Sequence, residues 1–322
     1  MLEVLNCAPL TSIQDLGRPG LRHLGIASAG ALDPITVQQL NLLLGNNPNT
    51  AVIELTTGRG MFQFHQDAVI AFSGIDPGAR LLDRERLPLT GDQLLPGHAC
   101  SVRAGEILHL SGPRVAGPSY LAIAGGFQVP VVLGSRSTDL INRFGGLHGR
   151  SLQSGDCIAI GESDTKPAIR SGIRPPAPDG TLRAIQGPEY SLFRAQSRAD
   201  LWQEGWRVDR DSSRMGLRLQ GGRLLRQDNS EIPSSPVLPG VIQVPADGRP
   251  IILGNDAQTM GGYPRIATII RADLWQLAYL PPGSEVKLVE VSVEEARALA
   301  REEGEYLQRL ATTLDTEARV EA

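Results

Sequence analysis

The densest group of side chains able to bind or activate a small molecule lies at residues 255–265. Carboxylate, amide and hydroxyl groups stand there next to two adjacent glycines. Asp256 is a candidate proton acceptor, and Gln258 and Thr259 could orient an amide or a carboxylate. We therefore assign Asp256, Gln258 and Thr259 as candidate catalytic residues.

The two glycines of this run, Gly261 and Gly262, indicate a binding role. Adjacent glycines contribute nothing to an apolar core, but they let a ligand or a partner backbone approach closely. Tyr263 follows them as a wall of the site or a hydrogen-bond donor. Arg214 could join the group from a neighbouring strand, although a surface salt bridge explains it equally well. We assign all four residues to substrate binding.

A second candidate anion holder is Arg18, which lies in a turn between Gly17 and Gly20. The planar guanidinium group can bind a carboxylate through two parallel hydrogen bonds. The alternative is that Arg18 simply pairs with Asp15. For the nearby Asp33 we prefer a role as a helix cap to a role in a site.

A third cluster, at residues 134–139, places three hydroxyl groups around an arginine. Ser135 and Arg136 are its candidate substrate-binding residues, because hydroxyl, amide and guanidinium groups all donate to anions. A solvated turn would have a similar composition. Our hypothesis is that the hairpins near residues 18, 136 and 261 converge on one anion-binding pocket that opens toward another polypeptide.

Composition excludes several classes of protein. The formal net charge is −4, and we expect no nucleic-acid surface because a basic stripe is missing. Lys166 and Lys287 are the only lysines beside 29 arginines, which disfavours a lysine-based covalent mechanism. The histidine and cysteine spacings do not indicate a metal site. With no apolar run of 18 residues and no basic, apolar leader, the sequence predicts a cytoplasmic protein without a membrane span.

The elements expected to position these groups are mainly strands. Gly and Pro number 36 and 23 in 322 residues, yet 41% of the chain is hydrophobic, which is typical of short strands joined by tight turns. Four turns begin with a glycine followed by a polar residue and an apolar strand, at 91–94, 105–108, 155–158 and 283–286. A helix is predicted from Asp33, with Pro34 in the first helical position.

The same pattern divides the chain into parts. We expect a β-rich N-terminal domain at residues 1–162, a proline-rich linker at 163–181, and a C-terminal β-barrel domain at 182–322. The last domain ends in an amphipathic helix that begins with a capping box at Ser292 and Glu295. Weak sequence similarity between residues 127–130 and 242–245 raises the alternative of a duplicated barrel unit.

Motifs spread over nearly the whole chain form an ordered series: Gln14-Asp15-Leu16-Gly17-Arg18, Ser28-Ala29-Gly30-Ala31-Leu32-Asp33, Leu43-Leu44-Gly45-Asn46, Glu54, Ala124-Gly125-Gly126, Leu133-Gly134-Ser135-Arg136-Ser137-Thr138, Ser213-Arg214-Met215-Gly216, Gly240-Val241-Ile242-Gln243-Val244-Pro245 and Gln258-Thr259-Met260-Gly261-Gly262-Tyr263-Pro264. This series resembles the KipA family, also called allophanate hydrolase subunit 2 or biotin-dependent carboxyltransferase-like. Within it, the likeness is strongest to the C-subunit branch (PxpC) of bacterial ATP-dependent 5-oxoprolinases. The chain departs from the family pattern at Met260, where relatives usually carry a second threonine, and at Pro236, near a frequent glycine.

The resemblance implies a mainly β fold with a few helices, built from cyclophilin-like β-barrel units in two packed domains. It also implies a cytoplasmic enzyme that opens 5-oxoproline to L-glutamate with hydrolysis of ATP. The implied partners are the other two polypeptides of such a 5-oxoprolinase, one KipI-like and the other called PxpA. Because the sequence has no phosphate-binding loop motif, we expect ATP to be shared with or held by a partner.

Two other functions fit the same family. The first is a biotin-dependent carboxyltransferase acting on urea or another amide. Neither lysine lies between methionines, so we expect no biotin on this chain and a carrier elsewhere. The second is a regulatory protein that antagonises a kinase inhibitor, in which the glycine-rich segments would form a docking surface.

Overall fold

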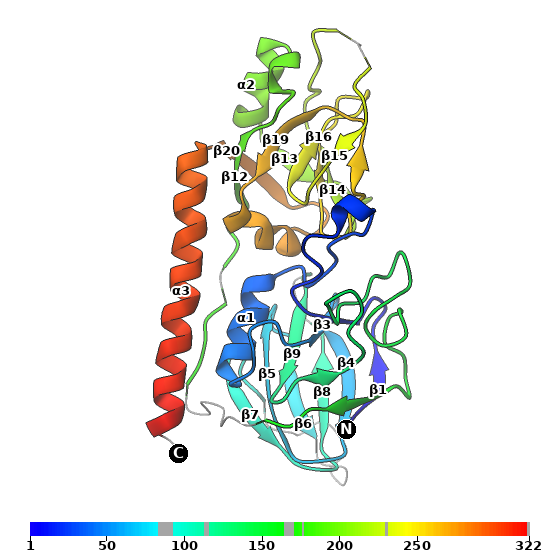
Figure 1. Cartoon of the computed structure of the whole chain (residues 1–322), viewed down its shortest axis with the longest axis vertical. Helices are drawn as coiled ribbons and strands as arrows, with labels where there is room; N and C mark the ends of the chain where they lie inside the picture. The colour runs from blue at the N-terminus through cyan, green and yellow to red at the C-terminus, as the bar shows by residue number, and fades with distance from the viewer. Residues whose placement is uncertain (83–92, 113–115, 164–170, 176, 229–230, 321–322) are drawn as a thin grey trace. The chain divides into compact units, whose positions relative to one another are not determined.

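The computed structural model describes residues 1–82, 93–112, 116–163, 171–175, 177–228 and 231–320. These residues form a mainly β structure with a closed seven-stranded barrel, further sheets and a long C-terminal helix (Figure 1). Two compact units can be separated. The first comprises Met1–Arg18, Ala29–Pro176 and Glu305–Ala322, and the second comprises Pro19–Ser28 and Ala177–Gly304.

The first unit contains a six-stranded sheet, in the order β10-β11-β1-β4-β8-β6, and a five-stranded sheet, in the order β2-β3-β9-β5-β7. Their strands are β1 (Leu2–Cys7), β2 (Ser12–Gln14), β3 (Val52–Leu55), β4 (Arg59–Phe64), β5 (Ala68–Gly74), β6 (Ala79–Leu82), β7 (Ala99–Val102), β8 (Ile107–Ser111), β9 (Ser119–Ile123), β10 (Phe127–Gln128) and β11 (Cys157–Ile160). Apolar side chains of both sheets, such as Phe62 and Phe72, pack in one core cluster.

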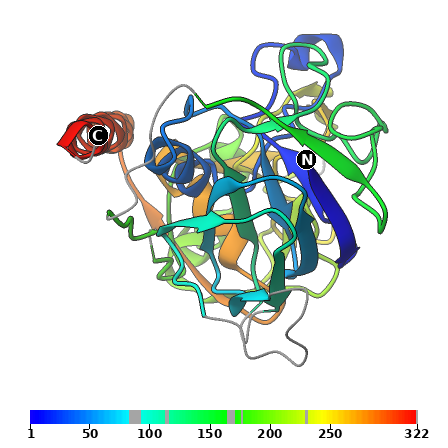
Figure 2. The ribbon, with the colours of Figure 1, turned by 90° about the horizontal axis from the view of Figure 1, so that it is seen from below.

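Helix α1 (Pro34–Leu43) packs against the five-stranded sheet of the first unit, as the blue helix in Figure 2 shows. Asp33 is its N-cap, because the Asp33 carboxylate accepts hydrogen bonds from the backbone N–H groups of Ile35 and Thr36, both at 3.0 Å. Pro34 occupies the first helical position. The predicted cap and helix start are therefore confirmed.

The second unit is built on the closed barrel, with strand order β12-β19-β16-β17-β14-β13-β20. These strands are β12 (Thr181–Gln186), β13 (Trp206–Val208), β14 (Gly216–Gln220), β16 (Val241–Gln243), β17 (Ile251–Leu253), β19 (Arg265–Ile269) and β20 (Glu285–Glu290). The parallel pairing of β12 with β20, which places Leu182 opposite Leu288, closes the barrel around the buried Trp206 and Ile242. Closure leaves this sheet without a free edge.

Shorter elements complete the second unit. A 3-10 turn (Tyr190–Leu192) and α2 (Ala195–Gln203) follow β12, a 3-10 segment (Arg271–Tyr279) precedes β20, and β15 (Ser235–Pro236) pairs with β18 (Met260–Gly261). The β15–β18 pair is a two-stranded ribbon, and the predicted glycine-rich run lies at its edge.

The C-terminal helix α3 (Val293–Val320) begins with the predicted capping box. The Ser292 hydroxyl accepts from the Glu295 backbone N–H at 3.1 Å, and the Glu295 carboxylate accepts from the Ser292 backbone N–H at 2.7 Å. Its last part belongs to the first unit, where Leu314 joins the apolar cluster around α1. No helix of the described residues is both long and apolar enough to span a membrane.

The observed division differs from the sequence-based boundaries in two exchanged segments. The chain passes between units at Pro176, inside the predicted linker, of which residues 164–170 and 176 lie outside the described residues. However, the segment Pro19–Ser28 belongs to the second unit, and the end of α3 belongs to the first. Of the four predicted glycine turns, those at Gly105, Gly155 and Gly283 have the expected positive φ, and the turn at 91–94 begins outside the described residues.

Candidate functional site

In the first unit, the Asp15 carboxylate joins the two predicted clusters. It accepts hydrogen bonds from the hydroxyls of Ser135 and Ser137, both at 2.6 Å, from the Arg136 backbone N–H at 2.6 Å, and from the Gly17 backbone N–H at 2.8 Å. Asp15 is only 2% exposed. A buried carboxylate that accepts four such bonds is well satisfied. The Ser135 hydroxyl, which the sequence assigned to substrate, is thus committed to Asp15.

Arg18 is also buried, with 1% of its surface exposed, and among the described residues it forms no ion pair with Asp15. Its Nε donates to the Val132 carbonyl at 3.1 Å, its Nη2 donates to the Ser137 carbonyl, and its guanidinium lies 4.7 Å from the centre of the Phe144 ring. Burial lowers the pKa of Arg18, while the charges of the nearby carboxylates oppose this shift. Within the described part of the chain, Nη1 has no hydrogen-bond partner.

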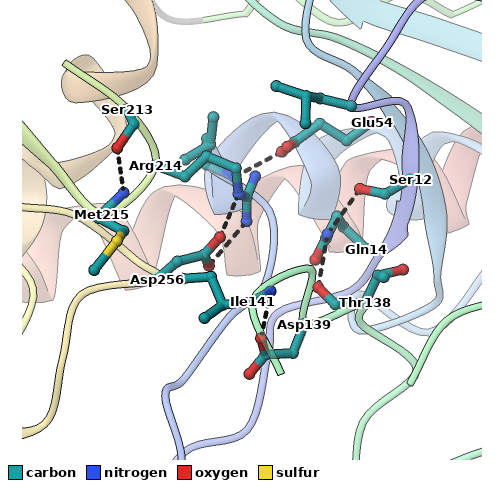
Figure 3. Close-up of polar contacts among 12 residues, drawn as sticks. Ser12, Gln14, Glu54, Thr138, Asp139, Ile141, Ser213, Arg214, Met215 and Asp256 are labelled. Atoms are coloured by element: carbon teal, nitrogen blue, oxygen red, sulfur yellow. Dashed lines mark hydrogen bonds and ion pairs between the residues drawn. The ribbon is translucent and has the colours of Figure 1, made fainter. Parts of the chain in front are cut away.

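The strand β2 anchors the same loop. Gln14 Nε2 donates to the Ser12 hydroxyl at 2.9 Å and to the Thr138 carbonyl at 3.2 Å, and the Asp139 carboxylate accepts from the Ile141 backbone N–H at 3.1 Å (Figure 3). Arg136 differs from these groups because its side chain is partly exposed and is fixed through Nε, at 3.1 Å from the Val129 carbonyl. Among the first-unit residues that we predicted, Arg136 is the one able to meet a ligand from solvent.

In the second unit, the structure brings Arg214 and Asp256 together in a bidentate ion pair, drawn in Figure 3. Arg214 Nε lies 2.7 Å from Asp256 Oδ2, and Nη2 lies 3.2 Å from Oδ1. The side chains are 10% and 7% exposed. Geometry of this kind is among the strongest polar contacts, and removing one partner leaves a buried charge. The Asp256 side chain is therefore held in place by the Arg214 guanidinium.

Gln258 and the residues that follow it, up to Tyr263, are more exposed to solvent than Asp256. Gln258 is exposed, and its Nε2 lies 3.4 Å from the side-chain oxygen of the buried Gln243. Gln243 in turn donates to the Tyr263 carbonyl at 3.3 Å. A Cβ at Gly261 would lie 2.5 Å from Gln243 Nε2, so a larger residue here would displace the Gln243 side chain. Thr259, half-buried, accepts through its carbonyl from the Val237 backbone N–H at 3.0 Å.

Gly262 and Tyr263 form part of the wall of a cavity of about 530 Å³ within the second unit. Tyr263 is 52% exposed. The cavity also contains Arg194 and Arg226, which sequence reasoning missed because neither lies in a glycine-rich run. The two-glycine segment, for which we predicted a binding role, thus lies beside a cavity that cationic groups also line.

A third missed residue is Arg22, in the segment that the second unit takes from the N-terminal part of the chain. Its guanidinium donates to the carbonyls of Val237 at 3.0 and 3.1 Å, Gln258 at 2.6 Å and Ala257 at 3.4 Å. Burial lowers its pKa. The clue in the sequence was an arginine between Gly20 and Gly25, directly after the Arg18 turn.

The family assignment rests on a match that covers most of the sequence. Residues 24–290 match the profile of the family described as carboxyltransferase domain, subdomain A and B. The chain belongs to this family. The predicted resemblance to carboxyltransferase-like proteins is therefore confirmed.

Individual relatives extend this result. The chain is 41% identical over 317 residues to the C subunit of 5-oxoprolinase from Escherichia coli, covering 98% of this chain and 100% of that protein. It is 38% identical to the C subunit of 5-oxoprolinase from Haemophilus influenzae, with 98% and 99% coverage. The solved structure of Kluyveromyces lactis urea carboxylase superposes with a TM-score of 0.86 at 27% identity, covering 96% of this chain but 29% of that one.

The two departures from the family pattern lie opposite each other. Pro236 of β15 and Met260 of β18 are register partners in the two-stranded ribbon. Because proline cannot donate to a ladder, it suits an edge such as this. The two positions therefore lie side by side in the ribbon that contains Gly261.

The structure thus brings together the Arg18 and 134–139 clusters in the first unit, and Arg214, Asp256 and the 258–263 segment in the second. Convergence of all three on one pocket stays a prediction. The described residues contain no group of three or more His, Cys, Asp or Glu side chains that could hold a metal ion.

Proposed function

We propose that this chain is the C subunit of an ATP-dependent 5-oxoprolinase. The observation that carries the proposal is the end-to-end match to the Escherichia coli protein of that name, at 41% identity with 98% and 100% coverage. Similarity to urea carboxylase, by contrast, covers a fraction of a longer chain. The proposed reaction converts 5-oxoproline, ATP and two waters to L-glutamate, ADP and phosphate in the cytoplasm.

The chemistry explains the need for ATP. A lactam amide resists attack by water, so transfer of the γ-phosphoryl group to the amide oxygen creates a leaving group. Water then adds to the carbon of the phosphorylated amide, and the C–N bond breaks as the nitrogen takes a proton. This leaves an acyl phosphate, from which a second water releases phosphate. Guanidinium groups suit both the substrate carboxylate and the charge that develops on the phosphoryl oxygens.

The described residues support a binding and orienting role for this chain. The Arg214 ion pair fixes Asp256 at the start of the turn that presents Gln258 and Thr259. Gln258 is exposed and can orient the lactam amide through both its donor and its acceptor. We propose that ATP is held mainly by the partners, the KipI-like and PxpA polypeptides, since this sequence has no phosphate-binding loop motif.

Reconstitution tests the function directly. The purified chain is mixed with the KipI-like and PxpA polypeptides, and ATP-dependent loss of 5-oxoproline is followed together with release of glutamate. We expect turnover only when all three are present. Turnover that persists without this chain, or none with the complete set, contradicts the proposal.

Gln258→Ala gives the sharper test of the site, because Gln258 is exposed and its loss leaves no buried charge. Removing an orienting hydrogen bond in a transition state lowers kcat by about 100-fold or more. Co-purification with both partner polypeptides is the control for assembly. Full activity of this variant in an intact complex removes Gln258 from the catalytic residues.

The second candidate is a component of a biotin-dependent carboxyltransferase, favoured by the 0.86 TM-score against urea carboxylase. This function needs a biotinylated carrier on another chain. Avidin-detectable biotin on a co-purifying protein, together with bicarbonate-dependent turnover of urea or an amide, would support it in place of 5-oxoproline hydrolysis.

A further inference from the structure

The cavity beside Tyr263 has the composition of a site for a small carboxylate. Its lining includes the buried side chains of Leu224 and Val244, and its volume of about 530 Å³ lies within the usual range for ligand pockets. Arg194 and Arg226 supply cationic groups, and Tyr263 supplies a phenol. Apolar surface with a few convergent polar groups is the common pattern of small-molecule sites.

The two arginines are held by paired segments. Phe193 and Arg226 form an antiparallel bridge, and the Arg194 backbone N–H donates to the Leu225 carbonyl at 3.0 Å. Arg194 Nε donates to the Arg226 carbonyl at 3.1 Å, so the fork of Arg194 is oriented by the backbone that carries Arg226. The paired backbone therefore places both guanidinium groups at one cavity.

The state of each guanidinium suits an external anion. The terminal nitrogens of Arg194 have no hydrogen-bond partner among the described residues, and this side chain reaches solvent. Arg226 is 18% exposed and contacts Asp228 at 3.2 Å, a carboxylate that is itself 65% exposed. Because the Asp228 carboxylate is open to solvent, a bound carboxylate can compete with it for Arg226.

The charges around the cavity favour a single carboxylate over a polyphosphate. Glu231 lies on its wall, and Asp228 is close to Arg226. The several negative charges of a nucleoside triphosphate would be repelled by both carboxylates, whereas the single charge of a small monocarboxylate is balanced by the two arginines. A further stretch of the wall, Gly262 to Pro264, leaves room for a compact ring because Gly262 has no side chain.

We propose that this cavity binds the carboxylate of 5-oxoproline through Arg194 and Arg226, with the lactam ring against the Gly262–Tyr263 wall. The inference rests on the proposed function for the identity of the ligand. The same groups would receive the carboxylate of glutamate after ring opening.

The test uses Arg194→Ala and Arg226→Lys in the reconstituted three-component complex, with Arg223→Ala as the matched control. Arg223 is an exposed arginine on the same loop that does not line the cavity. Loss of a charge-assisted hydrogen bond should raise KM for 5-oxoproline about 10- to 100-fold in Arg194→Ala. KM for ATP should stay unchanged, and Arg223→Ala should behave as the wild type.

The outcomes separate this inference from the proposed function. If the wild-type complex is active and both cavity variants keep the wild-type KM for 5-oxoproline, the inference is overturned while the function stands. A rise in KM for ATP alone shows a phosphate site and also overturns it. If the wild-type complex is inactive, calorimetric titration of the full chain with 5-oxoproline and with L-glutamate decides: binding that Arg194→Ala removes supports the cavity, and absence of binding refutes it.

Discussion

We expect the second unit of the Arg22→Ala variant to unfold at a markedly lower temperature than in the wild type. The Arg22 guanidinium connects a segment distant in sequence to the turn that carries Gln258. Its donors reach three carbonyls, those of Val237, Ala257 and Gln258, at 2.6 to 3.4 Å. Val237 is buried, with 1% of the residue exposed. Water therefore cannot fully replace the lost donor at that carbonyl.

The magnitude follows from opposing contributions. A hydrogen bond from a charged donor contributes about 1.5–3 kcal/mol, but two contacts share one acceptor and the 3.4 Å contact is weak, so we count about two effective bonds. Burial lowers the pKa of Arg22, and Nη1 is buried without a partner among the described residues, so desolvation offsets part of this gain. We expect a net loss of about 2–4 kcal/mol, a fall in Tm on the order of 10 °C.

Thermal unfolding followed by circular dichroism measures this loss, with two matched variants. His23→Ala removes the adjacent, exposed side chain and should leave Tm within about 1 °C of the wild type, as most surface substitutions do. Arg22→Lys keeps the charge but lacks the planar fork, so its Tm should lie between those of Arg22→Ala and His23→Ala. If Arg22→Ala melts together with His23→Ala, the carbonyl contacts do not hold the segment and the reasoning fails.

Two further predictions concern the same unit. Hydrogen bonding to Arg265 lowers the pKa of Glu189 below its ordinary value of 4.5, so the pair stabilises the fold above that pH and loses this contribution as pH falls through the lowered pKa. Glu189→Gln should therefore reduce Tm at pH 7 and flatten its dependence on pH in the acid range; an unaltered acid profile would show that the pair is not coupled to folding. Gly261→Ala should cost about 1–3 kcal/mol in denaturant unfolding, because its Cβ would lie 2.5 Å from Gln243 Nε2, whereas Gly262→Ala, with a nearest neighbour at 3.3 Å, should be milder. Equal stability of these two glycine variants would contradict this.

Sequence predicted the features of this fold that depend on neighbouring residues. Asp33 caps α1 because its carboxylate meets N–H groups two and three positions ahead, and the Ser292–Glu295 capping box likewise spans one turn. The exchange of Pro19–Ser28 into the second unit depends instead on contacts more than 200 residues away, such as Arg22 with Val237. No local pattern encodes that pairing.

The candidate site shows the same limit. Residue types marked the glycine run at Gly261 and the clusters around Asp15 and Ser135, but they did not show how the polar groups are used. Sequence left open whether Asp15 pairs with Arg18, and the structure shows Asp15 bound to the 135–137 loop about 120 residues away. The role of a charged group is decided by the partner that reaches it, and that partner is often remote in sequence.

The arginines of this chain can be ranked by what their terminal nitrogens contact. Arg18 is buried and Arg22 is half-buried, and both donate to backbone carbonyls, so they act as structural ties. Arg214 is committed to a buried carboxylate. Arg136 and Arg194 share a different arrangement, in which Nε is fixed at 3.1 Å from a backbone carbonyl while the side chain reaches solvent. A guanidinium oriented in this way loses little further freedom when an anion binds, which prepares both side chains to recognise a carboxylate.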